Sequence, residues 1–112
     1  MDIKAWLEQV GEPVGDTAFV DKQPLPFIVF TAQDNRLGAD LKNLAFLHQV
    51  RIERYTIDGI DNPALEALFD DATASRTYNG VAARKWTKQS IYISEEQMFE
   101  TIYNLSFWER TD

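Results

Sequence analysis

The strongest constraint on the fold is an alternating pattern across residues 98–108. Bulky side chains occupy every second position: Phe99, Thr101, Tyr103, Leu105 and Phe107. Met98, Ile102 and Trp108 fall on the opposite face. A period of two residues predicts a β-strand, and apolar side chains on both faces indicate that each face is at least partly covered. The chain therefore has to build a sheet around this strand.

Three further segments are predicted as strands: residues 27–31, 49–57 and 89–93. The second of these alternates, with Val50, Ile52, Arg54 and Thr56 on one face and Gln49, Arg51, Glu53 and Tyr55 on the other. Weaker strand signals cover residues 17–20 and 81–85. Residues 33–40 contain turn-forming residues and are expected to form a turn region, and residues 73–80 a polar loop. Residues 40–47 fit either a short helix or a loop.

Two segments are predicted as amphipathic helices, residues 3–10 and 62–72, because their apolar residues recur at helical spacing. Asp2 suits the N-cap of the first helix. Asn62 suits the N-cap of the second, followed by Pro63 in the first turn. The predicted fold class is α+β, with two helices packed on one face of an antiparallel sheet of about four strands, in a single domain spanning residues 1–112. The other sheet face would stay largely wet in a lone domain.

Composition excludes several classes of function. The chain has no cysteine, which excludes disulfides, thiolate nucleophiles and Cys-ligated zinc. The formal net charge of −7 opposes binding to nucleic acid through phosphate neutralisation. The first residues show no signal-peptide pattern, and no stretch approaches the length of a membrane-spanning helix, so we expect a soluble protein.

A search for catalytic residues finds no convincing set, so we expect no enzyme, no cofactor and no metal. His48 is the sole histidine, with no acid partner nearby in sequence, and is expected at the surface or at a strand edge. The adjacent acids in Asp70-Asp71 and Glu95-Glu96 point apart on a helix or strand. Residues 58–62 lack the ligand spacing of a calcium loop and are expected to form a turn and a helix cap. Phosphate-loop, dinucleotide-binding and nucleophile-elbow motifs are absent.

One basic cluster contains an aromatic residue: Arg84, Lys85 and Lys88 flank Trp86. It could guard a sheet edge by charge, dock an acidic partner or another copy of the chain, or stack on nucleic acid. We favour these interpretations in that order. Trp108 lies near the end of the final strand, opposite the main apolar face, and is the best candidate for an interface anchor. The candidate interface residues are Tyr55, Arg84, Trp86, Lys88 and Trp108.

Several segments of the chain resemble a known family. They are the run from Leu25 to Phe30, residues 38–44, the pattern Val50-x-Ile52-Glu53-x-Tyr55-Thr56 and residues 94–107. In these segments and their spacing the chain is similar to small proteins from the head–tail gene clusters of long-tailed bacteriophages and prophages, over roughly residues 1–110. Where that family usually has an apolar residue after Ile52-Glu53, this chain has Arg54. From this difference we expect the Val50–Ile52 face to be less buried at its end.

The resemblance implies a tail terminator, also called a tail-to-head joining or tail completion protein. Proteins of this kind form a ring, commonly six-fold, at the head-proximal end of the tail tube. The ring ends tube growth and meets the head connector, and DNA passes through its lumen without specific binding. The implied partners are further copies of the chain, the tail tube protein and the head-completion or connector protein. The implied location is the virion tail or neck, and the host cytoplasm during assembly.

Two other functions remain open. The chain could be another head–tail connector or minor tail protein, or an acidic inhibitor that mimics DNA. A mimic would place its carboxylates on one face, whereas Arg51-Ile52-Glu53-Arg54 interleaves acids and bases. A small enzyme would need a pocket with convergent polar groups, and the sequence offers none above background.

Overall fold

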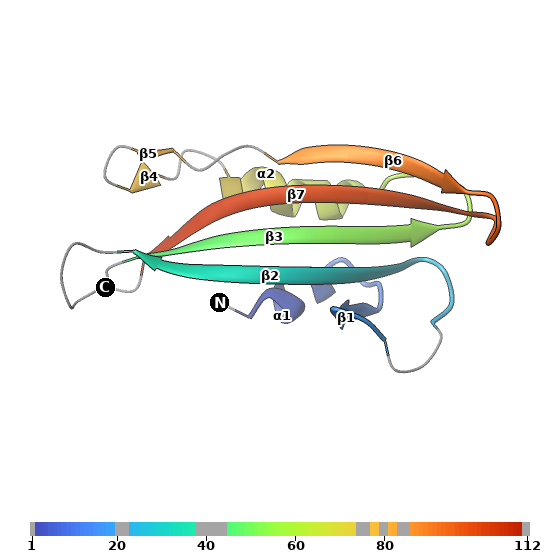
Figure 1. Ribbon diagram of the computed structural model, residues 1–112, viewed down its shortest axis with the longest axis horizontal. Coiled ribbons are helices and arrows are strands. Elements are labelled where there is room, and N and C mark those ends of the chain that lie inside the picture. Colours follow the sequence, from blue (N-terminus) through green and yellow to red (C-terminus); the bar gives the residue numbers. More distant parts are fainter. Residues whose placement is uncertain are drawn as a thin grey trace.

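A computed structural model describes residues 2–19, 23–37, 45–73, 77–78, 81–82 and 86–110. It is a mixed α/β fold with two helices, a five-stranded sheet and a small two-stranded sheet (Figure 1). The helices are α1 (Ile3–Glu8) and α2 (Pro63–Thr73). The large sheet has the order β1-β2-β3-β7-β6, and the small sheet pairs β4 with β5. The strands are β1 (Val14–Asp16), β2 (Phe27–Leu37), β3 (Ala45–Thr56), β4 (Thr77–Tyr78), β5 (Val81–Ala82), β6 (Thr87–Ile93) and β7 (Met98–Arg110).

The alternation predicted for the central strands is confirmed. In β3 the side chains of Val50, Ile52, Arg54 and Thr56 are buried, and in β7 those of Thr101, Tyr103, Leu105 and Phe107 are buried. The register places Ile52 opposite Tyr103 and Val50 opposite Leu105, so the two buried rows lie side by side. Ile28 and Phe30 of β2 extend the same face. This face of the sheet forms one wall of the hydrophobic core.

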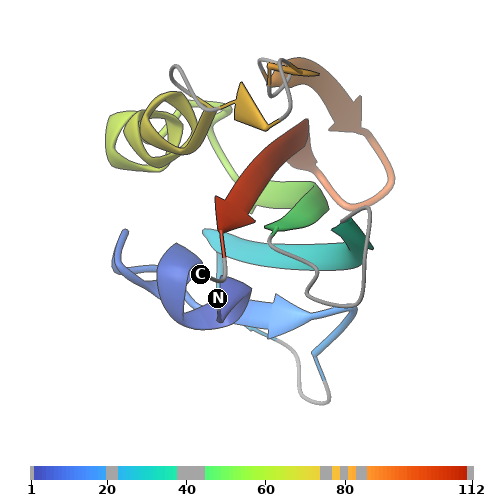
Figure 2. The same ribbon diagram turned by 90° about the vertical axis from the view of Figure 1, so that its left-hand side faces the viewer.

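Both helices cover that same face, so the sheet has one helix-bearing face and one helix-free face (Figure 2). Trp6 of α1 lies between the helices and the sheet, with its ring centroid 6.0 Å from that of Phe69 in α2 and 5.4 Å from that of Phe107 in β7. The predicted N-caps are confirmed. Asp2 accepts a hydrogen bond from the Ala5 backbone N–H at 3.1 Å, and Asn62 accepts one from the Ala64 N–H at 2.9 Å.

The structure changes the strand predictions at several segments. The described sheet has five strands where about four were expected, because residues 14–16 form β1 and pair in parallel with β2. The weak strand predicted at residues 17–20 therefore falls a few residues after the strand that forms, β1. Residues 33–37 continue β2 and are not a turn, since pairing with β3 outweighs their local turn preference. Residues 45–47 belong to β3, whereas residues 40–44 lie outside the described part of the chain. The strand expected at 81–85 is limited to β5 within the described residues.

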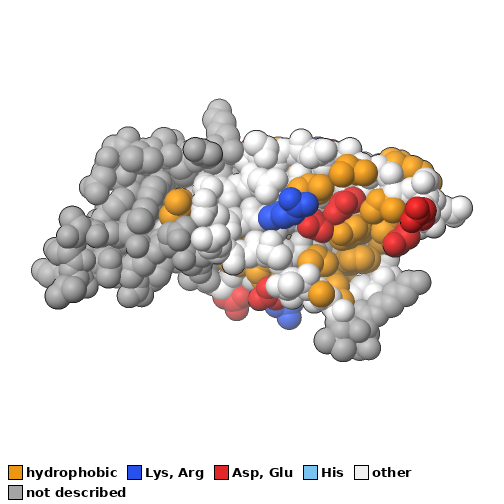
Figure 3. Space-filling view, viewed as in Figure 1, with side chains coloured by type: hydrophobic (Ala, Val, Ile, Leu, Met, Phe, Trp, Pro, Cys, Tyr) orange, Lys and Arg blue, Asp and Glu red, His pale blue; other side chains and the backbone are white. Residues whose placement is uncertain are grey.

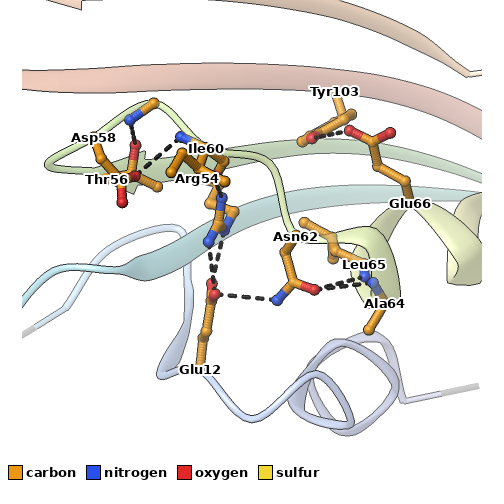
Figure 4. A network of polar contacts seen from close by, with 11 residues as sticks. Glu12, Arg54, Thr56, Asp58, Ile60, Asn62, Ala64, Leu65, Glu66 and Tyr103 are labelled. Atoms are coloured by element: carbon orange, nitrogen blue, oxygen red, sulfur yellow. Dashed lines mark hydrogen bonds and ion pairs between the residues drawn. The ribbon is translucent and has the colours of Figure 1, made fainter.

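The expectation for Arg54 is also wrong, because its end of the β3 face is buried. Only 6% of Arg54 is exposed. Its Nε and Nη2 atoms donate to the Glu12 carboxylate at 2.9 and 2.8 Å, and its Nη1 donates to the Ile60 carbonyl at 2.8 Å (Figure 4). The Asn62 amide also donates to Glu12, at 3.1 Å. A charged residue can lie in this core because a bidentate carboxylate and a carbonyl replace its hydration.

Candidate interaction surface

The helix-free face of the large sheet is the most distinctive surface of the described structure. Figure 3 shows it from the front, with hydrophobic, acidic and basic side chains gathered in its right-hand part and the white surface of other side chains and backbone beside them. The register assigns to this face the odd-numbered residues of β2, β3 and β6 and the even-numbered residues of β7. Ile102 is buried there by its neighbours, and Phe27 and Val29 are half-buried. The face is therefore partly apolar, although no described helix covers it.

An aromatic row closes one edge of this face. The Phe27 ring stacks on Tyr55 with centroids 5.0 Å apart, and Phe19 meets Phe27 edge-on at 5.6 Å. Gly15 of β1 lies against Phe19, and a Cβ atom at this glycine would come within 3.0 Å of the ring. The glycine therefore allows the segment after β1 to fold over the sheet.

Four polar side chains form a hydrogen-bonded cluster beside the aromatic row. The Tyr55 hydroxyl contacts two carboxylates, Glu53 at 2.8 Å and Glu100 at 3.0 Å. Arg51 donates from Nε to Glu53 at 2.9 Å. Tyr55 pairs directly with Glu100 across β3 and β7, which brings the two acids together although they are far apart in sequence. We call Arg51, Glu53, Tyr55 and Glu100 the carboxylate cluster.

The cluster shifts the pKa values of its two acids in opposite directions. Burial raises the pKa of Glu53, but hydrogen bonds from Arg51 and Tyr55 outweigh it, so the pKa of Glu53 is lowered. Burial and the neighbouring Glu53 raise the pKa of Glu100. Burial and the two carboxylates also raise the pKa of Tyr55, which keeps its hydroxyl protonated as a donor. One cationic group serves two carboxyl groups, which leaves the cluster with surplus negative charge when both acids are ionised.

A shallow hollow of about 620 Å³ lies next to this cluster, over the middle strands. Its lining includes Thr31, Gln33, Gln49, Asn104 and Ser106, and Arg51 is the one charged residue among those that line it. Hydroxyl and amide side chains can form hydrogen bonds with a partner surface, but this lining offers no acid–base pair for catalysis.

The predicted interface residues do not gather in one place. Tyr55 belongs to the carboxylate cluster on the helix-free face. Trp86 and Lys88 lie on the helix-bearing side, where they contact α2. Arg84 lies outside the described residues. The backbone of Trp108 is part of β7 and pairs with Leu47, but its side chain lies outside the described part.

Trp86 and Lys88 attach β6 to α2. The Trp86 indole donates to Asp70 at 2.8 Å, and its ring meets Phe69 and Tyr103. The Lys88 ammonium contacts Asp61 closely and Glu66 at 2.8 Å, and these two acids raise the pKa of Lys88. Tyr103 donates from its hydroxyl to the same Glu66 carboxylate at 2.8 Å.

His48 differs from its expected position. It is 2% exposed, and its ring lies 5.1 Å from that of Phe107 on the helix-bearing face. The expectation of a surface or edge position is wrong because the strand alternation aligns His48 with Val50 and Ile52. The expected turn chemistry is confirmed, since Asp58 accepts from the Ile60 N–H at 3.0 Å. Among the described side chains, no group of three or more potential metal ligands comes together.

The sequence reasoning missed the contact that Glu53 and Glu100 share through Tyr55. It considered acids that are neighbours in sequence, whereas these two meet only through the β3–β7 register. A sequence signal was present, because both residues alternate with buried positions along predicted strands, but these two strands were not expected to pair with each other. Using it would have required the register, which local patterns do not define.

A scan of the chain against protein-family models gives no match, and a search of curated proteins finds no relative. Within the described residues, no helix has both the length and the apolar character needed to cross a membrane.

Proposed function

We propose that this protein is a structural subunit that forms a homo-oligomeric ring, most simply six-fold, at the head-proximal end of a long phage tail. The ring ends growth of the tail tube and joins the tail to the head connector, and DNA passes through its lumen. The subunit acts by assembly rather than catalysis, in the host cytoplasm during assembly and in the virion tail or neck afterwards. The proposal rests on the sequence resemblance together with surfaces that a lone subunit leaves uncovered.

The observation that carries the proposal is the helix-free face. Aromatic and aliphatic side chains lie there beside the carboxylate cluster, in which Glu53, Tyr55 and Glu100 are half-buried and Arg51 is exposed. Tyr and Arg surrounded by apolar side chains are typical of the energetic centre of a protein–protein interface. A purely solvent-facing sheet would instead carry polar residues at nearly every position.

A second uncovered feature lies at one end of the sheet, in the loop between β3 and α2. Ile57 and Ile60 are 72% and 68% exposed there. Gly59 lies between them with φ +74°. The loop is held by hydrogen bonds from the Gly59 N–H to the Thr56 hydroxyl at 2.9 Å and from the Ile60 N–H to Asp58 at 3.0 Å. Two isoleucines presented by a fixed loop at the end of the strands suit contact with a ring stacked above or below, such as the tail tube or the connector.

The test is co-assembly. The protein is mixed with a tail tube protein from the same genome and examined by negative-stain electron microscopy. We expect tubes of defined length capped by a ring at one end, whereas tube protein alone should give tubes of unregulated length. The variant Ile57→Ser/Ile60→Ser should cap fewer tubes. The control variant Ala67→Ser, at an exposed position of α2, should cap normally.

The alternatives predict different outcomes. A connector or minor tail protein would bind virion components without limiting tube length. A DNA mimic would remain a monomer or dimer and would displace DNA from a host DNA-binding protein. Either result, with no capped tubes, would reject the tail-terminator proposal.

A further inference from the structure

β6 is an edge strand without the usual protection against pairing. It closes one side of the large sheet and pairs with β7 alone among the described strands. Its one charged residue, Lys88, contacts acids associated with α2 and does not guard the edge. Ile91 and Tyr92 are 39% and 53% exposed. Natural edges are usually protected by charge, proline, a bulge or shortness, and none of these protects the seven residues of β6.

The opposite side of the sheet has an open edge of the same length. β1 pairs with residues 28–30 of β2, and no other described strand pairs with the outer side of residues 31–37. The open part of β2 thus matches the seven residues of β6. The described side chains here, Thr31, Ala32 and Gln33, are uncharged and exposed.

We infer that neighbouring copies join by antiparallel pairing of β6 in one copy with residues 31–37 of β2 in the next. The inference rests on the proposed ring and deepens it by naming the contact between subunits. Each neighbouring pair in β2-β3-β7-β6 is antiparallel, so β2 and β6 run in opposite directions. In a ring, rotation about the ring axis leaves the direction of every strand relative to that axis unchanged. β2 of the neighbouring copy therefore meets β6 antiparallel, with the helices of both copies on the same side.

The offset between the two open edges fits a closed ring. β6 lies level with residues 98–104 of β7, whereas residues 31–37 of β2 lie level with residues 104–110. Joining the two edges shifts each copy along the strands by about six residues, or roughly 20 Å. Each copy adds four strands, which span roughly 19 Å across the sheet. This stagger corresponds to a strand tilt of about 45°, close to the tilt that closed barrels require. Edges without an offset would give a sheet with no tilt.

Two cross-strand pairs of described side chains fit in the register that uses both open edges fully. This register sets Ile91 opposite Gln33 on the helix-free face and Tyr92 opposite Ala32 on the other face. Tyr92, the most exposed aromatic residue described, then covers one of the smallest side chains of β2. A large residue opposite a small one lets two sheet edges meet without a clash, and aromatic cross-strand contacts add to the stability of the pair. The same register sets Lys88 opposite Arg36, and the charge of Lys88 is offset by its ion pairs with Asp61 and Glu66.

Disulfide trapping tests this contact, because the chain has no native cysteine. The full-length protein carrying Gln33→Cys and Ile91→Cys is oxidised at high concentration, alone and on tail tubes. β2 and β6 of one chain are separated by two strands, so a disulfide can form only between copies. We expect a ladder of multiples of 12.9 kDa on a non-reducing gel. The control Gln33→Cys/Tyr92→Cys points its thiols to opposite faces and should give at least tenfold less product.

Cysteine at 89 or 93 in place of 91 covers a slip of two residues in the register. Capped tubes without a ladder from any of these pairs would overturn the edge pairing and leave the tail function intact. A ladder from a protein that never caps tubes would support the edge pairing and reject the tail function. As a second readout, Ile91→Lys/Tyr92→Lys puts charge on the edge at exposed positions. It should abolish rings while the melting temperature stays within about 2 °C, whereas intact rings would overturn the inference.

Discussion

The ion pair between Glu12 and Arg54 gives the sharpest prediction about stability. The two side chains are only 11% and 7% exposed, and the pair joins the segment after α1 to β3. Replacing Glu12 by alanine removes the acceptor of two guanidinium hydrogen bonds and of the Asn62 amide. Breaking a buried pair by removing one partner costs about 3–5 kcal/mol. We expect about 3 kcal/mol, at the lower end of that range, because the Ile60 carbonyl still accepts from Arg54.

For a domain of this size, a loss of that magnitude lowers the melting temperature by about 12 °C. Urea and thermal unfolding followed by circular dichroism measure it. Arg54→Met should lose a similar amount, and the double variant Glu12→Ala/Arg54→Met should lose clearly less than both single losses together, because no charge is then left buried alone. Arg51→Gln removes a more exposed ion pair, whose side chains are 49% and 26% exposed, and serves as the control with the smaller loss. A loss below about 1 kcal/mol for Glu12→Ala, with additive effects in the double variant, would refute this account of the pair.

Four further predictions concern charge, backbone, assembly and DNA. Glu100→Gln should raise the free energy of unfolding at neutral pH by roughly 0.5 kcal/mol, because it removes one of two facing carboxylates; thermal melts at several pH values measure this. Gly59→Ala should lower the free energy of unfolding by about 2 kcal/mol, measured in urea, because φ is +74° and the new Cβ would lie 3.1 Å from the Phe99 ring. Trp108→Ala should weaken ring assembly, followed by light scattering, more than it lowers the melting temperature. The protein should show no measurable binding to duplex DNA by anisotropy titration at about 0.15 M salt.

Each of these predictions has its own control or contrary result. The gain from Glu100→Gln should vanish as the pH falls through the raised pKa of Glu100, because the wild-type acid is then protonated and the repulsion is relieved in both proteins. Gly11→Ala has a similar φ of +85° but open space around its Cβ. If it lowered the free energy of unfolding as much as Gly59→Ala, the clash with the Phe99 side chain could not be the cause of the Gly59→Ala loss. A large loss of melting temperature with unchanged assembly would mark Trp108 as a core residue. Saturable micromolar DNA binding that is lost in Lys85→Glu/Lys88→Glu would reverse the DNA prediction.

Local sequence patterns predicted most elements and their buried faces. Residues 98–108 showed the alternation of β7 because both of its faces are partly covered, and the helix caps at Asp2 and Asn62 were visible as residue types at fixed offsets. The extent of β2 was not predictable, because residues 33–37 favour turns locally and become a strand only through pairing with β3. β1 has three residues and a glycine, too little for a periodic signal.

The candidate site was less predictable than the fold because it depends on register. Tyr55 was identified from its place on the exposed face of β3, but its acid partners come from two strands that meet only in the folded chain. The burial of Arg54 was likewise hidden, since its partner Glu12 precedes it by 42 residues. A charged residue on an apolar strand face is consistent with either an exposed strand end or a buried ion pair, and the location of the counter-charge decides between them.

The fold also explains why the one basic segment with an aromatic residue is a poor site for nucleic acid. Stacking on a base needs a free aromatic face, and phosphate contacts need cations that face solvent. The Trp86 ring lies against Phe69 and Tyr103 and its indole N–H is bonded to Asp70, while the Lys88 ammonium lies between two carboxylates. Trp86 and Lys88 thus hold β6 against α2, and each of them contacts an acidic side chain. In an assembled ring the remaining acidic surplus would repel phosphate, which is the condition under which DNA slides through a channel without binding to its wall.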